Sequence, residues 1–181
     1  MPPKLETLIV KGEVSMVEPN EVGSLTFDHS NTSPKAINAL GTRNLNWYKS
    51  VAVVMATQHC AVIAHIPSDS PDDRLISNGL KAFIDKCRAT VPADDRWPRH
   101  FAIINPVEDT DSDITNFRRD RIVAFLADHH QPGDLKPKVF NYVVSMEYDW
   151  TKALVFVDAR TPGKVTIFVE DQDAITFYST S

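Results

Sequence analysis

The fold is decided by the stretch SVAVVMATQHCAVIAH, which runs from Ser50 to His65. Two runs rich in β-branched and small apolar residues, separated by polar residues, predict a β-hairpin whose turn is centred on Thr57 and Gln58. With that turn, Ser50 pairs with His65 at the open end of the hairpin. Because the Cβ atoms of directly paired residues lie about 5 Å apart, we expect the hydroxyl and the imidazole to lie within hydrogen-bonding reach.

Both faces of this hairpin are apolar. The predicted register places two further pairs on the face of Ser50 and His65: Ala52 with Ile63, and Val54 with Ala61. The opposite face holds the pairs Val51 with Ala64, Val53 with Val62, and Met55 with Cys60. A strand that is apolar on both faces is typically covered on both sides. We therefore expect this hairpin in the middle of a layered structure, with its polar open end at the rim of a core.

Composition limits the class of protein. The chain has 181 residues, of which 43% are hydrophobic, and we expect a single α+β domain spanning residues 1–181. A formal net charge of −5 argues against nucleic-acid and anionic-membrane partners. No apolar run is long enough to cross a bilayer, and the first residues lack the apolar segment of a secretory signal, so we expect a cytoplasmic protein. The sequence predicts no oligomeric state.

Neither cysteine nor histidine spacing predicts a disulfide framework, a metal site or a cofactor. Cys60 is also a poor candidate for the nucleophile paired with His65. Five residues of strand, at about 3.3 Å each, separate the two by roughly 16 Å. Cys60 is therefore expected to be structural, as is Cys87, which falls on the apolar stripe of a predicted helix.

Two helices are predicted after the hairpin. The first begins near Ser70, where Ser-Pro-Asp-Asp combines a capping hydroxyl, a proline and acidic residues. The second begins near Ser112 and Asp113. Their apolar stripes are Ile76, Leu80, Phe83, Ile84 and Cys87 in the first helix, and Ile114, Phe117, Ile122, Phe125 and Leu126 in the second.

Strands are predicted on both sides of these helices. They cover Leu5–Val14, Gly23–Phe27, His100–Asn105, Val139–Met146, Ala153–Ala159 and Lys164–Glu170, with an edge strand at Ala174–Tyr178. The turn signal Arg160-Thr-Pro-Gly163 joins two of them in a second hairpin. The expected fold is α+β, a layered sandwich in which two main helices cover a mostly antiparallel sheet with Ser50–Ile66 as its central hairpin.

The hairpin and the order of elements resemble the chemoreceptor glutamine deamidases, or CheD-like proteins. In that family a small-residue loop delivers a cysteine nucleophile to the start of a Val-Ala-Val strand, and the returning strand ends in Ala-His before a proline. Here the matching segments are Lys49-Ser-Val-Ala-Val-Val-Met55 and Ala61-Val-Ile-Ala-His-Ile-Pro67. The likeness covers much of the chain by topology, and its specific motifs cover the hairpin.

The resemblance implies roles for particular residues. Ser50 stands at the position of the nucleophilic cysteine, and His65 at that of the general base. Asn44 occupies the spacing of the family's assisting threonine, with Thr42 close by, and Asn44-Leu-Asn-Trp-Tyr-Lys49 replaces the glycine-rich approach to the nucleophile. A serine nucleophile also needs oxyanion donors, which we expect from the backbone near residues 47–50.

Three functions fit these residues. The first is a hydrolase or amidohydrolase that acts on an amide or ester of a small molecule or protein, with Ser50 as nucleophile and His65 as base. Thr42, Asn44 or Asp69 would orient the imidazole, and Trp47, Tyr48, Lys49 and Asp69 would contact the substrate. The second is a binding module that has lost catalysis and uses Trp47 and Tyr48 as anchors. The third is a biosynthetic enzyme in which His65 or Lys49 performs acid–base chemistry without a covalent step.

Overall fold

The predicted hairpin is present and lies at the centre of a sheet. In the computed structural model, β4 (Val51–Ala56) and β5 (Cys60–Ile66) pair antiparallel, and every residue of both strands is buried. Two-sided burial of the hairpin is therefore confirmed. The structure describes residues 4–30, 33, 36–68, 73–107, 112–144 and 153–179.

The predicted register of the hairpin is wrong by two residues. His65 pairs with Ala52, not with Ser50. The turn is centred one residue later than expected, on Gln58 and His59, because the Thr57 hydroxyl accepts the backbone N–H groups of His59 and Cys60 at 3.0 and 3.2 Å. A shift of two residues leaves each side chain on its predicted face.

The strands form two sheets, where the sequence predicted one. The sheet that contains the hairpin, here the hairpin sheet, has the order β2-β5-β4-β6-β7, and the second sheet has the order β1-β3-β8-β9-β10. The other strands are β1 (Ser15–Met16), β2 (Val22–Thr26), β3 (Ala39–Thr42), β6 (His100–Val107), β7 (Lys138–Val143), β8 (Val155–Asp158), β9 (Lys164–Val169) and β10 (Gln172–Tyr178). Each sheet contains one parallel pair, β1 with β3 and β6 with β7, and its other pairs are antiparallel.

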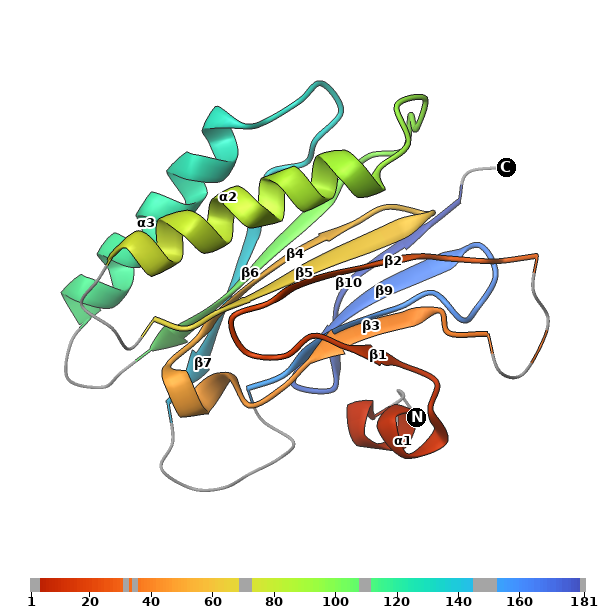
Figure 1. Ribbon diagram of the computed structural model, residues 1–181, viewed down its shortest axis with the longest axis horizontal. Coiled ribbons are helices and arrows are strands. Elements are labelled where there is room, and N and C mark those ends of the chain that lie inside the picture. Colours follow the sequence, from red (N-terminus) through yellow and green to blue (C-terminus); the bar gives the residue numbers. More distant parts are fainter. Residues whose placement is uncertain are drawn as a thin grey trace.

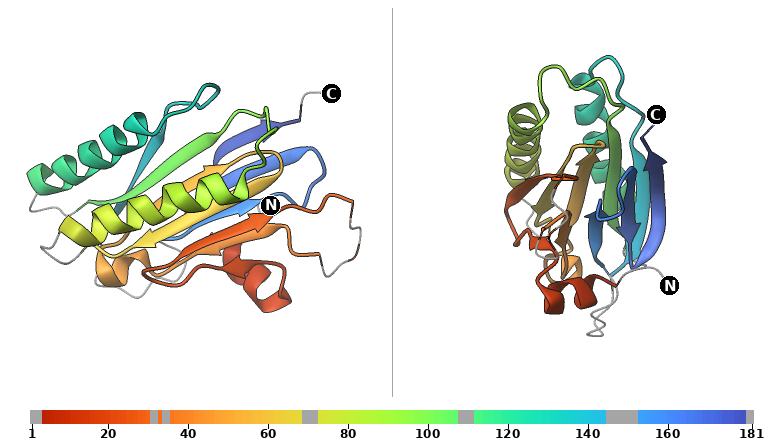
Figure 2. Two further views of the ribbon diagram at one scale, coloured as in Figure 1. Left: turned by 45° about the horizontal axis from the view of Figure 1, so that its top comes forward. Right: turned by 90° about the vertical axis from the view of Figure 1, so that its right-hand side faces the viewer.

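The two sheets and the helices are stacked in layers. Helices α2 (Asp73–Thr90) and α3 (Ser112–Asp128) cover the outer face of the hairpin sheet, and the second sheet packs against its inner face (Figure 1, Figure 2). Alternate residues of β4 enter the two cores: Ala52 and Val54 face the second sheet, and Val51 and Val53 face the helices. The chain is thus an α+β protein, as predicted, with one more β-layer than expected.

The segment predicted as a strand over Leu5–Val14 is wrong. Residues Leu5–Lys11 form helix α1, which buries Leu5 and Leu8 against Phe156 of the second sheet and leaves Val10 85% exposed. Gly12 ends the helix in the left-handed conformation (φ 68°), with the paired backbone hydrogen bonds of a Schellman motif. The β-branched residues favoured a strand, but the three-residue spacing of the buried leucines and this glycine favour a helix.

The predicted helix stripes are confirmed in α2 and only partly in α3. All five residues of the α2 stripe are buried, as are Ile122 and Leu126 in α3, and Phe125 is half-buried. Phe117, however, is 64% exposed. Five residues of α-helix turn through about 500°, which places Phe117 about 140° around the helix from Ile122. Residues 69–72 and the side chain of Ile114 lie outside the described part of the chain. None of the described helices has the length and apolar character needed to cross a bilayer.

Helix α2 approaches the hairpin most closely at Gly79. A Cβ atom at this position would lie 2.9–3.1 Å from three side-chain atoms of Ile66 in β5. In a solvent-exposed helix interior, Gly→Ala stabilises by about 1 kcal/mol. Here we expect Gly79→Ala to destabilise the protein by about 1–3 kcal/mol, because overpacking outweighs helix propensity.

Chemical denaturation with a circular dichroism signal measures this difference. Asn78→Ala, at the neighbouring exposed position of α2, is the matched control, for which we expect no loss of stability. A Gly79→Ala protein as stable as the wild type would show that α2 does not contact β5 at this distance.

Candidate functional site

The two sheets bring Thr42 and His65 together. Thr42 ends β3 of the second sheet, and His65 lies one residue before the end of β5 in the hairpin sheet. Their side chains face each other across the inner core, with 2.7 Å between Thr42 Oγ1 and His65 Nδ1. The sequence left Thr42, Asn44 and Asp69 open as partners of the imidazole, and within the described residues the hydrogen bond is made by Thr42.

This hydrogen bond determines which nitrogen of His65 carries the proton. Thr42 Oγ1 lies 2.8 Å from the carbonyl oxygen of Val17, which can only accept, so the single hydroxyl proton of Thr42 points to Val17. The Thr42 oxygen must then accept a hydrogen bond from His65 Nδ1–H. His65 is therefore the Nδ1–H tautomer, and its Nε2 carries a lone pair.

Burial keeps His65 neutral. Its side chain is completely buried, and this desolvation lowers its pKa from 6.5 to about 4. Nε2 has no hydrogen-bond partner in the described structure. A buried, neutral imidazole whose outer nitrogen is unpaired is the arrangement of a general base that awaits a proton donor.

Ser50 lies near this imidazole but is not bonded to it. It directly precedes β4 and is also completely buried, and its Oγ, like His65 Nε2, makes no hydrogen bond to any described residue. His65 pairs with Ala52, two residues beyond Ser50 and on the same face if the strand direction is continued. Such diagonal neighbours are separated by about 7–8 Å between Cα atoms, close enough for a long side chain to bridge but beyond the direct pair that was expected.

The turn that leads to Ser50 has an unusual backbone. A short 3₁₀ helix, η1 (Leu45–Tyr48), is flanked by Asn44 and Lys49, both in the left-handed region with φ of 62° and 44°. This conformation costs an L-residue about 1–2 kcal/mol and is normally assigned to glycine. Strain of this kind persists only where surrounding contacts hold it, and it is often found beside functional groups.

Two residues that the sequence did not suggest hold this turn. The buried Tyr142 of β7 places its hydroxyl 3.0 Å from the carbonyl oxygen of Leu45 and 2.7 Å from that of Ser50. The buried Ser68, just after β5, donates its hydroxyl proton to the carbonyl oxygen of Lys49. A buried hydroxyl needs a partner, but nothing in the pattern of the sequence indicates that these two converge on one turn.

Two of the expected oxyanion donors are already used. The N–H of Ser50 donates to Leu45 O at 2.8 Å, and the N–H of Lys49 donates to Asn46 O at 3.3 Å. In this conformation, both groups stabilise the turn and are not free to bind an oxyanion. The expectation that the backbone of residues 47–50 supplies these donors is thus wrong for Lys49 and Ser50.

The remaining predicted residues divide into two groups. Asn44 and Lys49 border the turn through their left-handed backbones. The side chains of Trp47 and Tyr48, and the whole of Asp69, lie outside the described residues. In the described part of the chain, no cluster of three histidine, cysteine or acidic side chains is suited to a metal ion.

Cys60 lies on the other face of the hairpin from His65. Its side chain packs in the core beneath the helices, 3.5 Å from the Thr57 hydroxyl, and burial raises the pKa of its thiol. Burial also raises the pKa of Cys87. Both cysteines are free and buried in the apolar core, and neither has the lowered pKa of a reactive thiol.

The lowered pKa of His65 makes the stability of the protein depend on pH. Between about pH 6.5 and pH 4, the unfolded chain binds a proton at this residue and the folded protein does not, so stability is lost as the pH falls through this range. Protonation of His65 is expected to lower the free energy of unfolding by about 3 kcal/mol over this pH range. We expect His65→Gln to flatten this part of the profile of unfolding free energy against pH, measured by denaturant titration.

His130→Gln, which removes an exposed histidine, is the control for the general effect of losing a histidine. The His65 contribution is read from the difference between the wild-type and His65→Gln profiles. If the unfolding free energies of the wild type and of His65→Gln change in parallel from pH 4 to pH 7, His65 is not buried in its neutral form.

Comparison with known proteins leaves the site to be interpreted from its own geometry. No protein-family model matches this chain, and no curated protein matches it.

Proposed function

We propose that this protein is a hydrolase of amides or esters, with Ser50 as nucleophile and His65 as general base. Ser50 Oγ would form a bond to the substrate carbonyl carbon while its proton passes to His65 Nε2. The same proton would then go to the leaving amine or alcohol, and water would release the acyl group. The observation that carries the proposal is the Thr42–His65 hydrogen bond, because it leaves Nε2 unprotonated and unpaired.

In this proposal Thr42 takes the role of the group that orients the imidazole. The Thr42 hydroxyl donates its proton to Val17 O, so its oxygen can only accept a hydrogen bond from His65 Nδ1–H. This contact fixes the orientation of the imidazole ring. It also stabilises the imidazolium that forms when Nε2 takes the proton of Ser50, though less than a carboxylate does. The resemblance to the chemoreceptor glutamine deamidases implies an assisting threonine, and the contact made by Thr42 supports that assignment over Asn44.

The backbone around Ser50 supports the same resemblance. The family approaches its nucleophile through a glycine-rich loop, and here Asn44 and Lys49 adopt positive φ values without being glycine. The chain therefore makes a glycine-like turn from other residues and holds it with Tyr142 and Ser68. We propose on these grounds that the fold is CheD-like and that serine replaces the family's cysteine.

The substrate class follows from the chemistry of the site. A serine and a neutral imidazole act on an acyl carbon, so the proposed substrate is an amide or ester, free or within a protein. Ser50, His65 and Thr42 are completely buried, so a substrate reaches them only when the surrounding segments move. We further propose a cytoplasmic protein without a nucleic-acid partner, since the formal net charge is −5.

One observation favours a second candidate. No hydrogen bond joins Ser50 Oγ to His65 Nε2, since each is unpaired within the described structure. In noncovalent acid–base chemistry on a small molecule, His65 would take a substrate proton directly and Ser50 would only line the site. The two candidates differ in whether Ser50 is required.

A fluorophosphonate probe, which modifies nucleophilic serines, separates the candidates. We expect the wild-type protein to be labelled once, at Ser50, as identified by mass spectrometry of its peptides. His65→Ala is expected to reduce the labelling rate by about 10²–10⁴, and Thr42→Val by a smaller factor that Thr42→Ser restores. Because the pKa of His65 is about 4, the rate is expected to be constant from pH 6 to 8 and to fall only below about pH 5.

Ser24→Ala, which removes a more exposed serine on β2, is the control and is expected to label at the wild-type rate. Labelling that survives Ser50→Ala at the wild-type rate would eliminate Ser50 as the nucleophile. If neither the wild type nor any variant reacts with the probe, the hydrolase is eliminated. The noncovalent enzyme and the binding module are then the remaining candidates.

Restoring the family's nucleophile tests the loop itself. We expect the thiol of Ser50→Cys to react with iodoacetamide faster than a cysteine in an unstructured peptide, because His65 Nε2 takes the thiol proton as general base while the sulfur attacks the probe. The wild-type protein gives the background, since Cys60 and Cys87 are buried and their thiol pKa values are raised. If the introduced thiol reacts more slowly than the peptide while the variant remains folded, this turn does not activate a nucleophile.

A further inference from the structure

A second candidate site lies at the other end of the hairpin. A cavity of about 330 Å³ opens beside the β4–β5 turn, where the two sheets come together, and is called here the Gln58 pocket. Figure 1 places this turn and η1 at opposite ends of the hairpin sheet, so the pocket is separate from the Ser50–His65 site. The residues that form it are Gln58, Trp97, Pro98, His100, Phe177 and Tyr178, with Arg96 at the margin.

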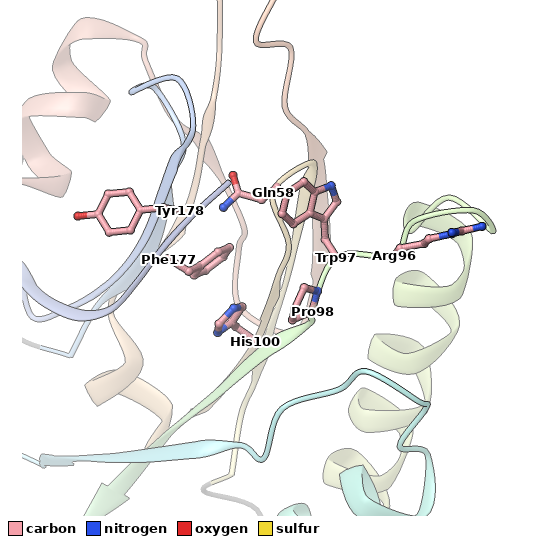
Figure 3. A pocket seen from close by; sticks show the side chains of 7 residues that line it. All are labelled: Gln58, Arg96, Trp97, Pro98, His100, Phe177 and Tyr178. Carbon is pink, nitrogen blue, oxygen red and sulfur yellow. The ribbon is translucent and has the colours of Figure 1, made fainter. Parts of the chain in front are cut away.

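Three separate segments build the walls of the pocket. The β4–β5 turn contributes Gln58, the loop before β6 contributes Trp97, and the end of β10 contributes Phe177. Figure 3 shows the Gln58 amide between the indole of Trp97 and the strand that carries Phe177. The pocket thus offers flat apolar walls with an amide between them.

The Gln58 amide is an incompletely satisfied polar group. Gln58 is 4% exposed, and its Nε2 has no hydrogen-bond partner among the described residues. The Nε2 atom is enclosed by the protein. Because leaving such a donor unpaired is costly, an acceptor on a ligand in the pocket favours rotation of the amide toward the ligand, which forms a hydrogen bond and breaks none at Nε2. A purely apolar ligand would leave this donor unpaired.

The floor of the pocket is aromatic and uncharged at neutral pH. His100 stacks on Phe177 with ring centroids 3.9 Å apart and planes 10° apart. Burial and the nearby Lys138 lower the pKa of His100, which favours the neutral ring. Of the described residues that line the pocket, Arg96 alone carries a full charge, and its side chain extends away from Gln58 (Figure 3). The pocket therefore favours a neutral ligand.

We propose that the Gln58 pocket binds a neutral, planar heteroaromatic ring of the size of a purine base. The ring would pack between Trp97 and Phe177, and one of its nitrogen or carbonyl acceptors would accept a hydrogen bond from the Gln58 amide. The volume is at the lower end of the range for small-molecule sites, and it accommodates a bicyclic ring. Aromatic side chains and a glutamine amide are groups that proteins use to stack on and hydrogen-bond to such rings.

The test uses two neutral bicyclic probes of similar size. Adenine carries ring nitrogens that accept hydrogen bonds, and 1-methylindole has a flat ring without such an acceptor. With ¹⁵N-labelled protein, we expect adenine to shift the side-chain NH₂ resonances of Gln58 and the indole N–H resonance of Trp97 saturably. We expect 1-methylindole to bind more weakly, and to lack the downfield shift of a Gln58 N–H proton that a hydrogen bond to adenine produces.

Variants assign the recognition to individual residues. Gln58→Leu keeps the volume of the side chain. It is expected to weaken the binding of adenine about tenfold and to leave the binding of 1-methylindole unchanged. Trp97→Ala is expected to weaken the binding of both probes. If this variant does not fold, Trp97→Phe takes its place; it keeps a flat ring and is expected to retain part of the affinity. Phe117→Ala, which removes an exposed aromatic ring on α3, is the control and is expected to change neither.

The proposal is overturned if neither probe binds the folded wild-type protein, or if adenine binds as tightly to Gln58→Leu as to the wild type. Equal weakening of both probes by Gln58→Leu also overturns it, because the amide would then act through packing alone. These outcomes do not depend on the reactivity of Ser50, so this inference and the proposed hydrolase activity stand or fail separately.

Discussion

Two-sided burial of the β4–β5 hairpin is the constraint on which the rest of the structure depends. A strand pair with no polar side chain on either face of its middle section is stable only when both faces are covered. The helices α2 and α3 cover one face, and the second sheet covers the other. The buried faces of β4 and β5 therefore determine the stacking order of the layers, and polar groups are left for the two ends of the hairpin.

The candidate site is a consequence of this stacking. His65 stands on the face of β5 that meets the second sheet, so its imidazole enters the core between the two sheets. The partner there has to be polar, and Thr42 satisfies Nδ1 while its own proton goes to Val17 O. Nε2 is left without a hydrogen-bond partner among the residues that the structure describes. One polar contact between sheets thus sets the tautomer and the free nitrogen of the histidine, and burial keeps it uncharged.

The sequence predicted those parts of the molecule that depend on local pattern. The two-sided hairpin, the apolar face of α2 and the pair β8–β9 all follow from periodicity or a turn signal, and the structure contains them. The register was wrong because a side-chain hydroxyl, Thr57, moved the turn by one residue, and hydrophobic periodicity does not change when a pairing slips by two. The second sheet and the role of Tyr142 were missed because both depend on contacts between residues far apart in the chain.

The Tyr142 contact has a consequence for how the protein is assembled. The turn before Ser50 is held by a side chain from β7, about ninety residues later in the chain, and β3, which carries Thr42, is held in its sheet by β8. Contacts of such sequence separation form late, because the entropy of closing long loops must be overcome first. During synthesis, a nascent chain that ends before β7 contains Ser50, His65 and Thr42 but neither of the strands that position them. The chemistry-bearing residues are thus made early, and their arrangement is completed only when the last third of the chain has folded.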